Sequence, residues 1–135
     1  MQAQVVIVDS TPQMLARVTA HPFVSVRLAA AEKLPFPESH FDAVLCSDAL
    51  HHFRDSEAAV GEMKRTVRPG GGVVILEMDG SGIGRLLSVA ERILGEPAGF
   101  RGPLDLQNYL ATRGIVGTST RQRGISYAFR GTVRA

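Results

Sequence analysis

Several residue types that would mark a particular protein class are scarce in this chain. Its 135 residues include one cysteine, no tryptophan and, among 15 basic residues, only two lysines. One cysteine can neither form an internal disulfide nor bind zinc alone, which favours a reducing, cytoplasmic location. No run approaches the roughly 18 apolar residues of a membrane-spanning helix, and no basic-then-apolar leader follows Met1. Secreted and transmembrane classes are therefore disfavoured.

The composition is that of an ordinary globular domain. Hydrophobic residues make up 44% and charged residues 21% of the chain, which excludes disordered and fibrous classes and allows one domain over residues 1–135. Residues 1–79 carry a net charge of −3 and residues 80–135 a net charge of +5. The basic half is either a solvated surface or a surface for phosphate or an acidic substrate. Nucleic acid is an unlikely partner, because no aromatic residues are interleaved for base stacking.

Apolar runs typical of strands alternate with stretches typical of helices. Strands are expected at 5–8, 24–28, 41–46 and 73–76, and helices after Ser10-Thr11-Pro12, from Asp55-Ser56 to about Val67, at about 83–95 and at about 104–113. The tail from about 117 to 134 reads as a closing hairpin, and the segment Leu34 to Pro37 as irregular. This alternation predicts an α/β, Rossmann-like three-layer sandwich with a mostly parallel sheet and an antiparallel C-terminal hairpin.

Polar residues follow three of the predicted strands, at the sheet edge where open parallel sheets bind ligands. Asp9 ends the first strand, where a carboxylate either accepts ribose hydroxyls or caps the following helix. Ser47 and Asp48 end the third strand, and Glu77 and Asp79 end the fourth. This edge is the expected site of chemistry.

The pair His51-His52 follows the third strand and has three interpretations: packing, a general base at a cleft rim, or a metal site. No further ligands stand at a metal-site spacing, so no metal is expected. Cys46 lies inside an apolar strand, where a thiol is normally inert. The glycines at 70–72 join a helix to a strand, the reverse of a phosphate-binding loop, and are expected to form a turn.

Five motifs follow one another along the first part of the chain. They are Val5-Val6-Ile7-Val8-Asp9 continuing to Leu15, Ala31-Glu32-Lys33-Leu34-Pro35-Phe36-Pro37, Phe41-Asp42-Ala43-Val44, Leu50-His51-His52-Phe53 and Arg68-Pro69-Gly70-Gly71-Gly72. In this order and spacing they resemble the class I S-adenosylmethionine-dependent methyltransferases of the ubiquinone- and menaquinone-biosynthesis type. A fainter likeness covers Leu104 to Ile115.

The resemblance implies a seven-stranded sheet in the order 3-2-1-4-5-7-6 and S-adenosylmethionine as cofactor. It also implies a role for residues at matching positions: Asp9 with Ser10 at the ribose, Met14 under the adenine, Ala31 and Glu32 beside the adenine, Ser47 and Asp48 at the methionine portion, and His52 toward the acceptor. Relatives that methylate amides and nucleic-acid bases usually have an Asn/Asp-Pro-Pro-aromatic motif after the family's fourth strand, which corresponds to the third strand expected in this chain. This chain reads Ser47-Asp48-Ala49-Leu50 there, which favours a small-molecule acceptor.

Two departures from the family pattern concern the cofactor. The first strand and its glycine-rich turn are expected before Gln4 and are missing, and Ala30 replaces an acidic residue that often grips the adenine. Without that central strand, the neighbouring strands pair directly, a second copy or partner chain completes the sheet, or the chain is a fragment. The expected function is methyl transfer to a small molecule, impaired in the isolated chain. The alternative is a non-catalytic interaction module, acting as a homodimer or with a partner subunit.

Overall fold

The computed structural model describes residues 2–47, 50–79, 89–90, 93–94 and 101–135. The elements are β1 (Val5–Asp9), α1 (Pro12–Leu15), β2 (Val24–Leu28), β3 (Phe41–Ser47), the 3-10 helix η1 (Leu50–His52), α2 (Ser56–Thr66), β4 (Val67–Met78), α4 (Pro103–Ala111), β5 (Ile115–Arg121) and β6 (Ser126–Val133). The predicted strands, the helix near 104–113 and the closing hairpin are confirmed. The helix predicted at about 83–95 falls largely outside the described residues.

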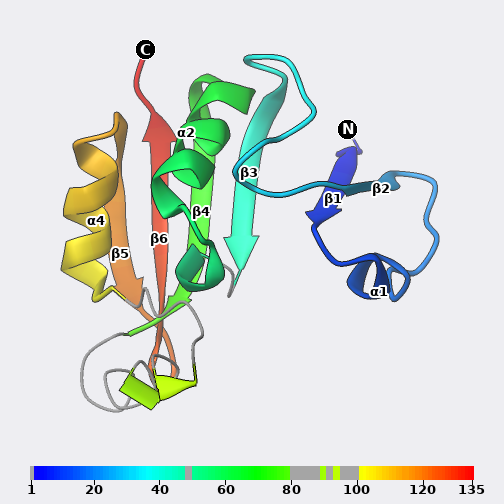
Figure 1. Cartoon of the computed structure of the whole chain (residues 1–135). Helices are drawn as coiled ribbons and strands as arrows, with labels where there is room; N and C mark the ends of the chain where they lie inside the picture. The colour runs from blue at the N-terminus through cyan, green and yellow to red at the C-terminus, as the bar shows by residue number, and fades with distance from the viewer. Residues whose placement is uncertain (1, 48–49, 80–88, 91–92, 95–100) are drawn as a thin grey trace.

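The strands form two sheets instead of one. β1 and β2 pair in parallel, and a second sheet has the order β3-β4-β6-β5, in which β3 is parallel to β4 while β6 is antiparallel to both of its neighbours. Figure 1 shows β1 on the side of its sheet nearer to β3, with both strands running in the same direction. Of the alternatives for the strands that flank the missing one, direct pairing is contradicted, since β1 and β3 belong to different sheets.

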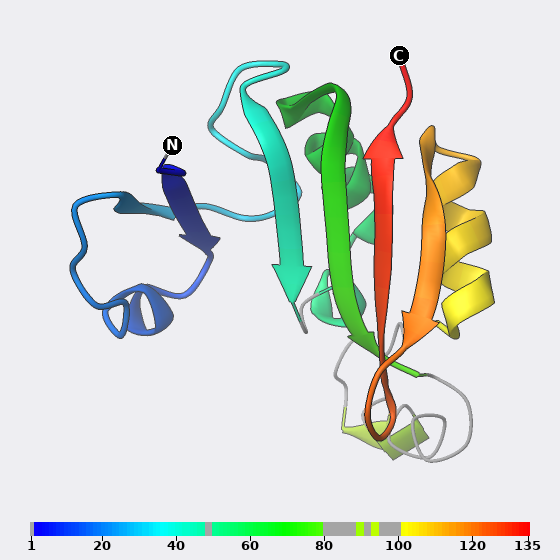
Figure 2. The same ribbon diagram turned by 180° about the vertical axis from the view of Figure 1, so that it is seen from behind.

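The four-stranded sheet has its core on one face. Figures 1 and 2 show α2 and α4 on the same face of this sheet. Side chains of β4 alternate, so that Val73, Ile75 and Glu77 are buried while the residues between them are half-buried. The core also includes Val60, Met63, Leu106, Leu110, Ile115, Tyr127 and Phe129. The alternation therefore places the carboxylate of Glu77 on the same face as the apolar core.

Local chemistry sets the start of α2 and the irregular start of β4. The Asp55 carboxylate accepts a hydrogen bond from the Ala58 amide at 2.9 Å, which caps the helix as predicted. Beyond the helix, Gly70 has a φ of 77°, which favours glycine. The prediction of a simple turn before a strand at 73 needs correction, because β4 begins at Val67 and its register against β3 shifts between Phe41 and Ala43.

The β1–α1–β2 unit is much more exposed than the four-stranded sheet. Helix α1 comprises four residues and buries none of them. A short helix gains its stability mainly from packing, and α1 has little surface to pack against. None of the described helices is long and apolar enough to cross a membrane.

A loop over residues 29–40 connects the two sheets and is fastened to α2. Arg65 donates hydrogen bonds to the carbonyl oxygens of Leu34 and Phe36 at 3.1 and 2.8 Å, and Glu62 accepts one from the Leu34 amide at 2.7 Å. Arg65 also pairs with Glu62 at 2.7 Å, and this hydrogen bond lowers the pKa of Glu62. The loop is irregular, as its prolines predict, but its position is defined by these contacts.

Candidate functional site

The carboxyl ends of the parallel strands β1, β3 and β4 lie at one edge of the molecule (Figure 1). Asp9 ends β1 and is half-buried, and its Oδ1 accepts a hydrogen bond from the Thr11 amide at 2.8 Å. Thr11, not Ser10, precedes the first helical residue, and its side chain makes no capping hydrogen bond. Asp9 thus stabilises the turn into α1, and its half-buried carboxylate lies at the carboxyl end of β1.

The other predicted cofactor residues occupy the same edge or the loops beside it. Met14 lies on α1 with 51% of its surface exposed, and Ala31 and Glu32 are half-buried in the loop after β2. Ser47 ends β3 and is exposed, whereas Asp48 lies outside the described residues. The predicted residues therefore line a strand-end surface, and no described residue closes a pocket over them.

His51 and Glu77 form a buried pair at the carboxyl ends of β3 and β4. The His51 Nδ1 lies 2.6 Å from Glu77 Oε2, and the Leu50 amide donates to Glu77 Oε1 at 2.9 Å. The two side chains are 5% and 4% exposed, so this carboxylate is held between two donors away from bulk water. The contact between Nδ1 and the carboxylate fixes the orientation of the imidazole ring.

His52 differs from its neighbour. It is exposed, and its ring centroid lies 4.0 Å from that of His51 at an interplanar angle of 46°. Its predicted role toward the acceptor stays a prediction. Of the two histidines, His51 is the one whose orientation is fixed by a carboxylate.

A second buried carboxylate and a tyrosine lie beside this pair. Asp79 is 3% exposed and its Oδ2 lies 2.6 Å from Arg121 Nη1. The Tyr127 hydroxyl donates to the Arg101 carbonyl oxygen at 2.8 Å. Burial, followed by the negative charges of Glu77 and Asp79, raises the pKa of Tyr127 well above its usual value, so the hydroxyl stays protonated and remains a donor.

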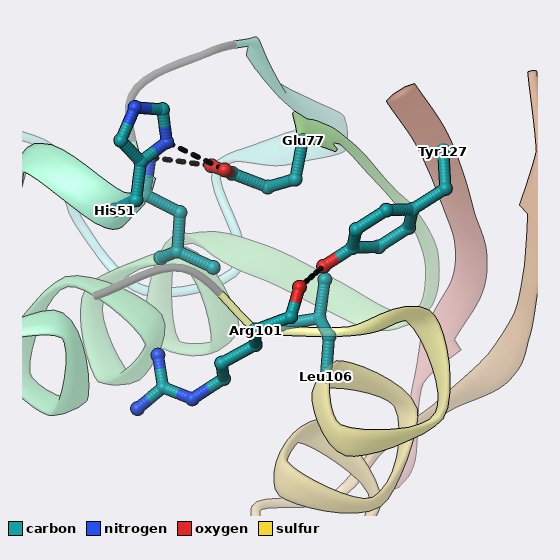
Figure 3. Close-up of a pocket in the computed structure, with 6 residues that line it drawn as sticks. His51, Glu77, Arg101, Leu106 and Tyr127 are labelled. Carbon is teal, nitrogen blue, oxygen red and sulfur yellow. Dashed lines mark hydrogen bonds and ion pairs between the residues drawn. The ribbon is translucent and has the colours of Figure 1, made fainter. Parts of the chain in front are cut away.

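Figure 3 shows how these side chains are arranged around a small pocket. His51 and Glu77 point toward each other, Tyr127 points to the backbone of Arg101, and the Arg101 side chain points away from the pair. The pocket is lined by Leu50, His51, Glu77, Arg101, Leu106 and Tyr127. The described side chains pack closely around the His51–Glu77 pair, which is almost completely buried.

The role of Glu77 was not among the predicted site residues, although a signal was present. Strict alternation along β4 puts Glu77 on the buried face with Val73 and Ile75. A carboxylate on such a face needs partners, and the adjacent histidines offered one. Among the residues that the structure describes, no group of His, Cys, Asp and Glu side chains could hold a metal ion, and Cys46 is buried in β3.

Comparison with protein families matches residues 1–75 to a family model described as a methyltransferase domain. Ubiquinone/menaquinone biosynthesis C-methyltransferases are among the relatives. That of Cupriavidus taiwanensis is 48% identical over 52 residues, which is 38% of this chain and 21% of that enzyme, and that of Chromobacterium violaceum is also 48% identical over 52 residues. The matched segment thus spans about a fifth of the length of these relatives.

Solved methyltransferases share the fold over almost the whole chain. A methyltransferase solved in complex with the Haloferax volcanii Trm112 activator superposes with a TM-score of 0.80 at 13% identity, over 98% of this chain and 73% of that one. A SAM-dependent methyltransferase of Thermotoga maritima gives 0.79 at 19% identity, over 96% and 81%. Human N-acetylserotonin methyltransferase, solved with SAM, gives 0.78 at 17% identity, over 98% and 41%.

Proposed function

Because this chain belongs to the S-adenosylmethionine-dependent methyltransferase family, we propose that it serves the transfer of a methyl group from S-adenosylmethionine to a small molecule. One observation carries the proposal: the nucleoside-binding candidates at the end of β1 and the buried His51–Glu77 pair at the ends of β3 and β4 lie at the same edge of the parallel strands. Open parallel sheets bind ligands at this edge.

The described residues fit the nucleoside half of the cofactor. Asp9 offers a half-buried carboxylate at a strand end, which suits ribose hydroxyls, and the exposed Met14 side chain on α1 offers an apolar surface to the adenine. Ala31 and Glu32 lie in the loop after β2. Ser47 is the last residue of β3 and is proposed to face the methionine portion of the cofactor. Among the described glycines, none joins the carboxyl end of a strand to a helix, so the described residues provide candidates for the nucleoside half and Ser47 for the methionine half.

On the acceptor side we assign an orienting role to the buried pair. The cofactor supplies an electrophilic methyl group when bound. Glu77 fixes the orientation of the His51 imidazole through the 2.6 Å hydrogen bond to Nδ1, at the carboxyl ends of β3 and β4. Methyl transfer depends mainly on the orientation of the acceptor toward the methyl group.

Calorimetric titration of the chain with S-adenosylhomocysteine tests the cofactor part of the proposal. We expect saturable binding, because the strand-end residues offer contacts to the nucleoside. Asp9→Ala is expected to weaken it, whereas Asp42→Ala, which removes an exposed carboxylate near the start of β3, should leave it unchanged. Absence of both heat and a thermal shift at millimolar ligand would overturn cofactor binding by this chain.

A second role, as an interaction module acting with another copy or a partner subunit, is favoured by the separation of the two sheets. Among the strands that the structure describes, β1 and β3 each have a neighbour on one side only. The Haloferax methyltransferase with the same fold was solved in complex with an activator protein, so this fold is compatible with a protein partner. Light scattering distinguishes a second copy from a separate partner, because only the former raises the mass of the purified chain.

A further inference from the structure

Arg101, in the basic half of the chain, carries a positive charge that no described carboxylate balances. The residue is half-buried, and its guanidinium takes part in none of the ion pairs or hydrogen bonds among the described side chains. Asp105, the acidic residue in the first turn of α4, is exposed and forms no ion pair with it. A half-buried guanidinium is costly without a partner, and its planar set of N–H donors matches a carboxylate or a phosphate.

The ring of Tyr109 in α4 holds this guanidinium close to a second one. The guanidinium carbons of Arg101 and Arg113 lie 4.1 and 3.8 Å from the centroid of the Tyr109 ring. The two positive charges are therefore within the Debye length of about 8 Å at physiological salt, and they repel each other. Glu57 at the start of α2 pairs with Arg113 at 3.3 Å, which leaves Arg101 as the charge without a described counterion. Stacking fixes the Arg101 guanidinium without using its N–H donors.

Arg101 also belongs to the wall around the His51–Glu77 pair. Its backbone oxygen accepts the hydrogen bond of the Tyr127 hydroxyl at 2.8 Å, and the residue lines the same small pocket as the pair. Figure 3 shows that its side chain points away from His51 and Glu77. An anion at the guanidinium is therefore kept apart from the Glu77 carboxylate, which would repel it at close range.

We infer that Arg101 binds an anionic group, a carboxylate or a phosphate, of the methyl acceptor. Arg113 adds a second positive charge beside it. This inference deepens the methyl-transfer role proposed above and rests on it, because it names the class of acceptor as an acidic small molecule. Since the guanidinium points away from the pair, the acidic group lies apart from the atom that receives the methyl group. A charge-assisted contact at one end and the buried pair at the other fix the orientation of the acceptor.

Titration of the full chain with 4-phenylbutanoate and, separately, with inorganic phosphate tests the inference without cofactor. The arginine Nε–H and histidine ring signals in NMR spectra report the binding. We expect a saturable shift of the Arg101 signal, and at least tenfold weaker binding in Arg101→Met because a charge-assisted contact is lost. Arg101→Lys, which keeps the charge without the planar donors, should recover part of the affinity. The control Arg130→Met removes the same charge from an exposed position of β6 and should not change binding.

The two probes distinguish the kinds of acidic group. Saturation by only one of them assigns a carboxylate or a phosphate, and saturation by both assigns a site for either group; each of these results supports the inference. The apolar tail of 4-phenylbutanoate should also shift the His51 ring signals, because it extends from Arg101 toward the pair. A shift at Arg101 without one at His51 would place the anion outside the acceptor site and would overturn the inference.

Two further results would also reject an acceptor site at Arg101. One is equal weakening in Arg101→Met and Arg130→Met, which would mean unspecific attraction to a basic surface. The other is the absence of any saturable shift in a folded chain. Because the titration contains no cofactor, these failures leave binding of S-adenosylmethionine standing. Loss of S-adenosylhomocysteine binding with the anion site retained would instead reject methyl transfer, so the two proposals fail separately.

Discussion

The two sheets of the molecule consist of similar strands but differ in burial. Val5 to Val8 and Val73 to Leu76 are both runs of apolar residues. None of residues 2–40 is buried, whereas Val73, Ile75, Tyr127 and Phe129 in the four-stranded sheet are fully enclosed. The difference arises from what packs on the strands: α2 and α4 cover a face of the larger sheet, and α1 buries nothing.

This difference divides the candidate site between regions of unequal stability. A two-stranded sheet is marginal alone, because it buries too little surface to offset its ordering entropy. The nucleoside-binding candidates belong to this region, and the His51–Glu77 pair belongs to the well-packed one. The acceptor side is therefore expected to stay ordered when the cofactor side opens locally.

The largest effect should come from leucine truncations in the two regions. Leu110 of α4 is fully buried, and Leu110→Ala should lower the free energy of unfolding by about 2–5 kcal/mol because it leaves a cavity. Leu28→Ala, at a leucine of β2 that is 59% exposed, should cost less than about 0.5 kcal/mol. Urea unfolding measures both, and comparable costs would contradict the division into a packed and an exposed region.

The next effect concerns the loop that fastens the exposed unit to α2. Arg65→Met removes the donors to the carbonyl oxygens of Leu34 and Phe36. Amide exchange at Leu34 should accelerate on the order of tenfold, while exchange in β6 stays unchanged, because the loop opens without the sheet. Arg68→Met, at an exposed arginine, is the control. Equal acceleration in both regions would show that they unfold as one unit.

Strand and helix positions could be predicted because local patterns determine them. The β-branched run at β1, the Asp55 cap of α2 and the prolines at 35 and 37 act within a few residues of themselves. The separation of the sheets could not be predicted from periodicity, since Val5 to Val8 looks like a buried strand. Burial is a property of neighbouring elements, and the pattern shows only that the strand is suited to being buried.

In the candidate site, too, the sequence predicts local features but not contacts between distant residues. The position of Asp9 at a strand end is predictable, because a strand end has a known place in a parallel sheet, whereas its role stays a prediction. The partnership of His51 with Glu77 joins residues 26 positions apart, and it depends on β3 and β4 lying side by side in register. His52 was chosen over His51 from likeness alone. Which of two adjacent histidines turns inward depends on the geometry of η1, and no spacing in the sequence specifies it.

A smaller effect on the free energy of unfolding is expected to depend on pH, and it originates in the four-stranded sheet. Burial, together with the charges of Glu77 and Asp79, raises the pKa of Tyr127 above its unfolded value of about 10. Above that pH the unfolded chain loses the phenolic proton while the folded chain keeps it, so stability falls as pH rises, by up to about 1.4 kcal/mol per pH unit. Tyr127→Phe should remove this fall in alkaline urea titrations, at a cost near neutral pH of about 1 kcal/mol for the lost bond to Arg101.

The smallest effect should come from the ion pair at the edge strand of the larger sheet. Arg68 Nε and Asp42 Oδ1 lie 2.7 Å apart, with side chains 57% and 88% exposed. A double-mutant cycle of Arg68→Ala and Asp42→Ala should give a coupling energy of about 0–1 kcal/mol that decreases with salt, because water and ions screen an exposed pair. Asp42 lies on β3, the strand that faces β1. A larger, salt-insensitive coupling would mean that this edge is shielded from solvent, and would remove the contrast between an open edge and a closed core.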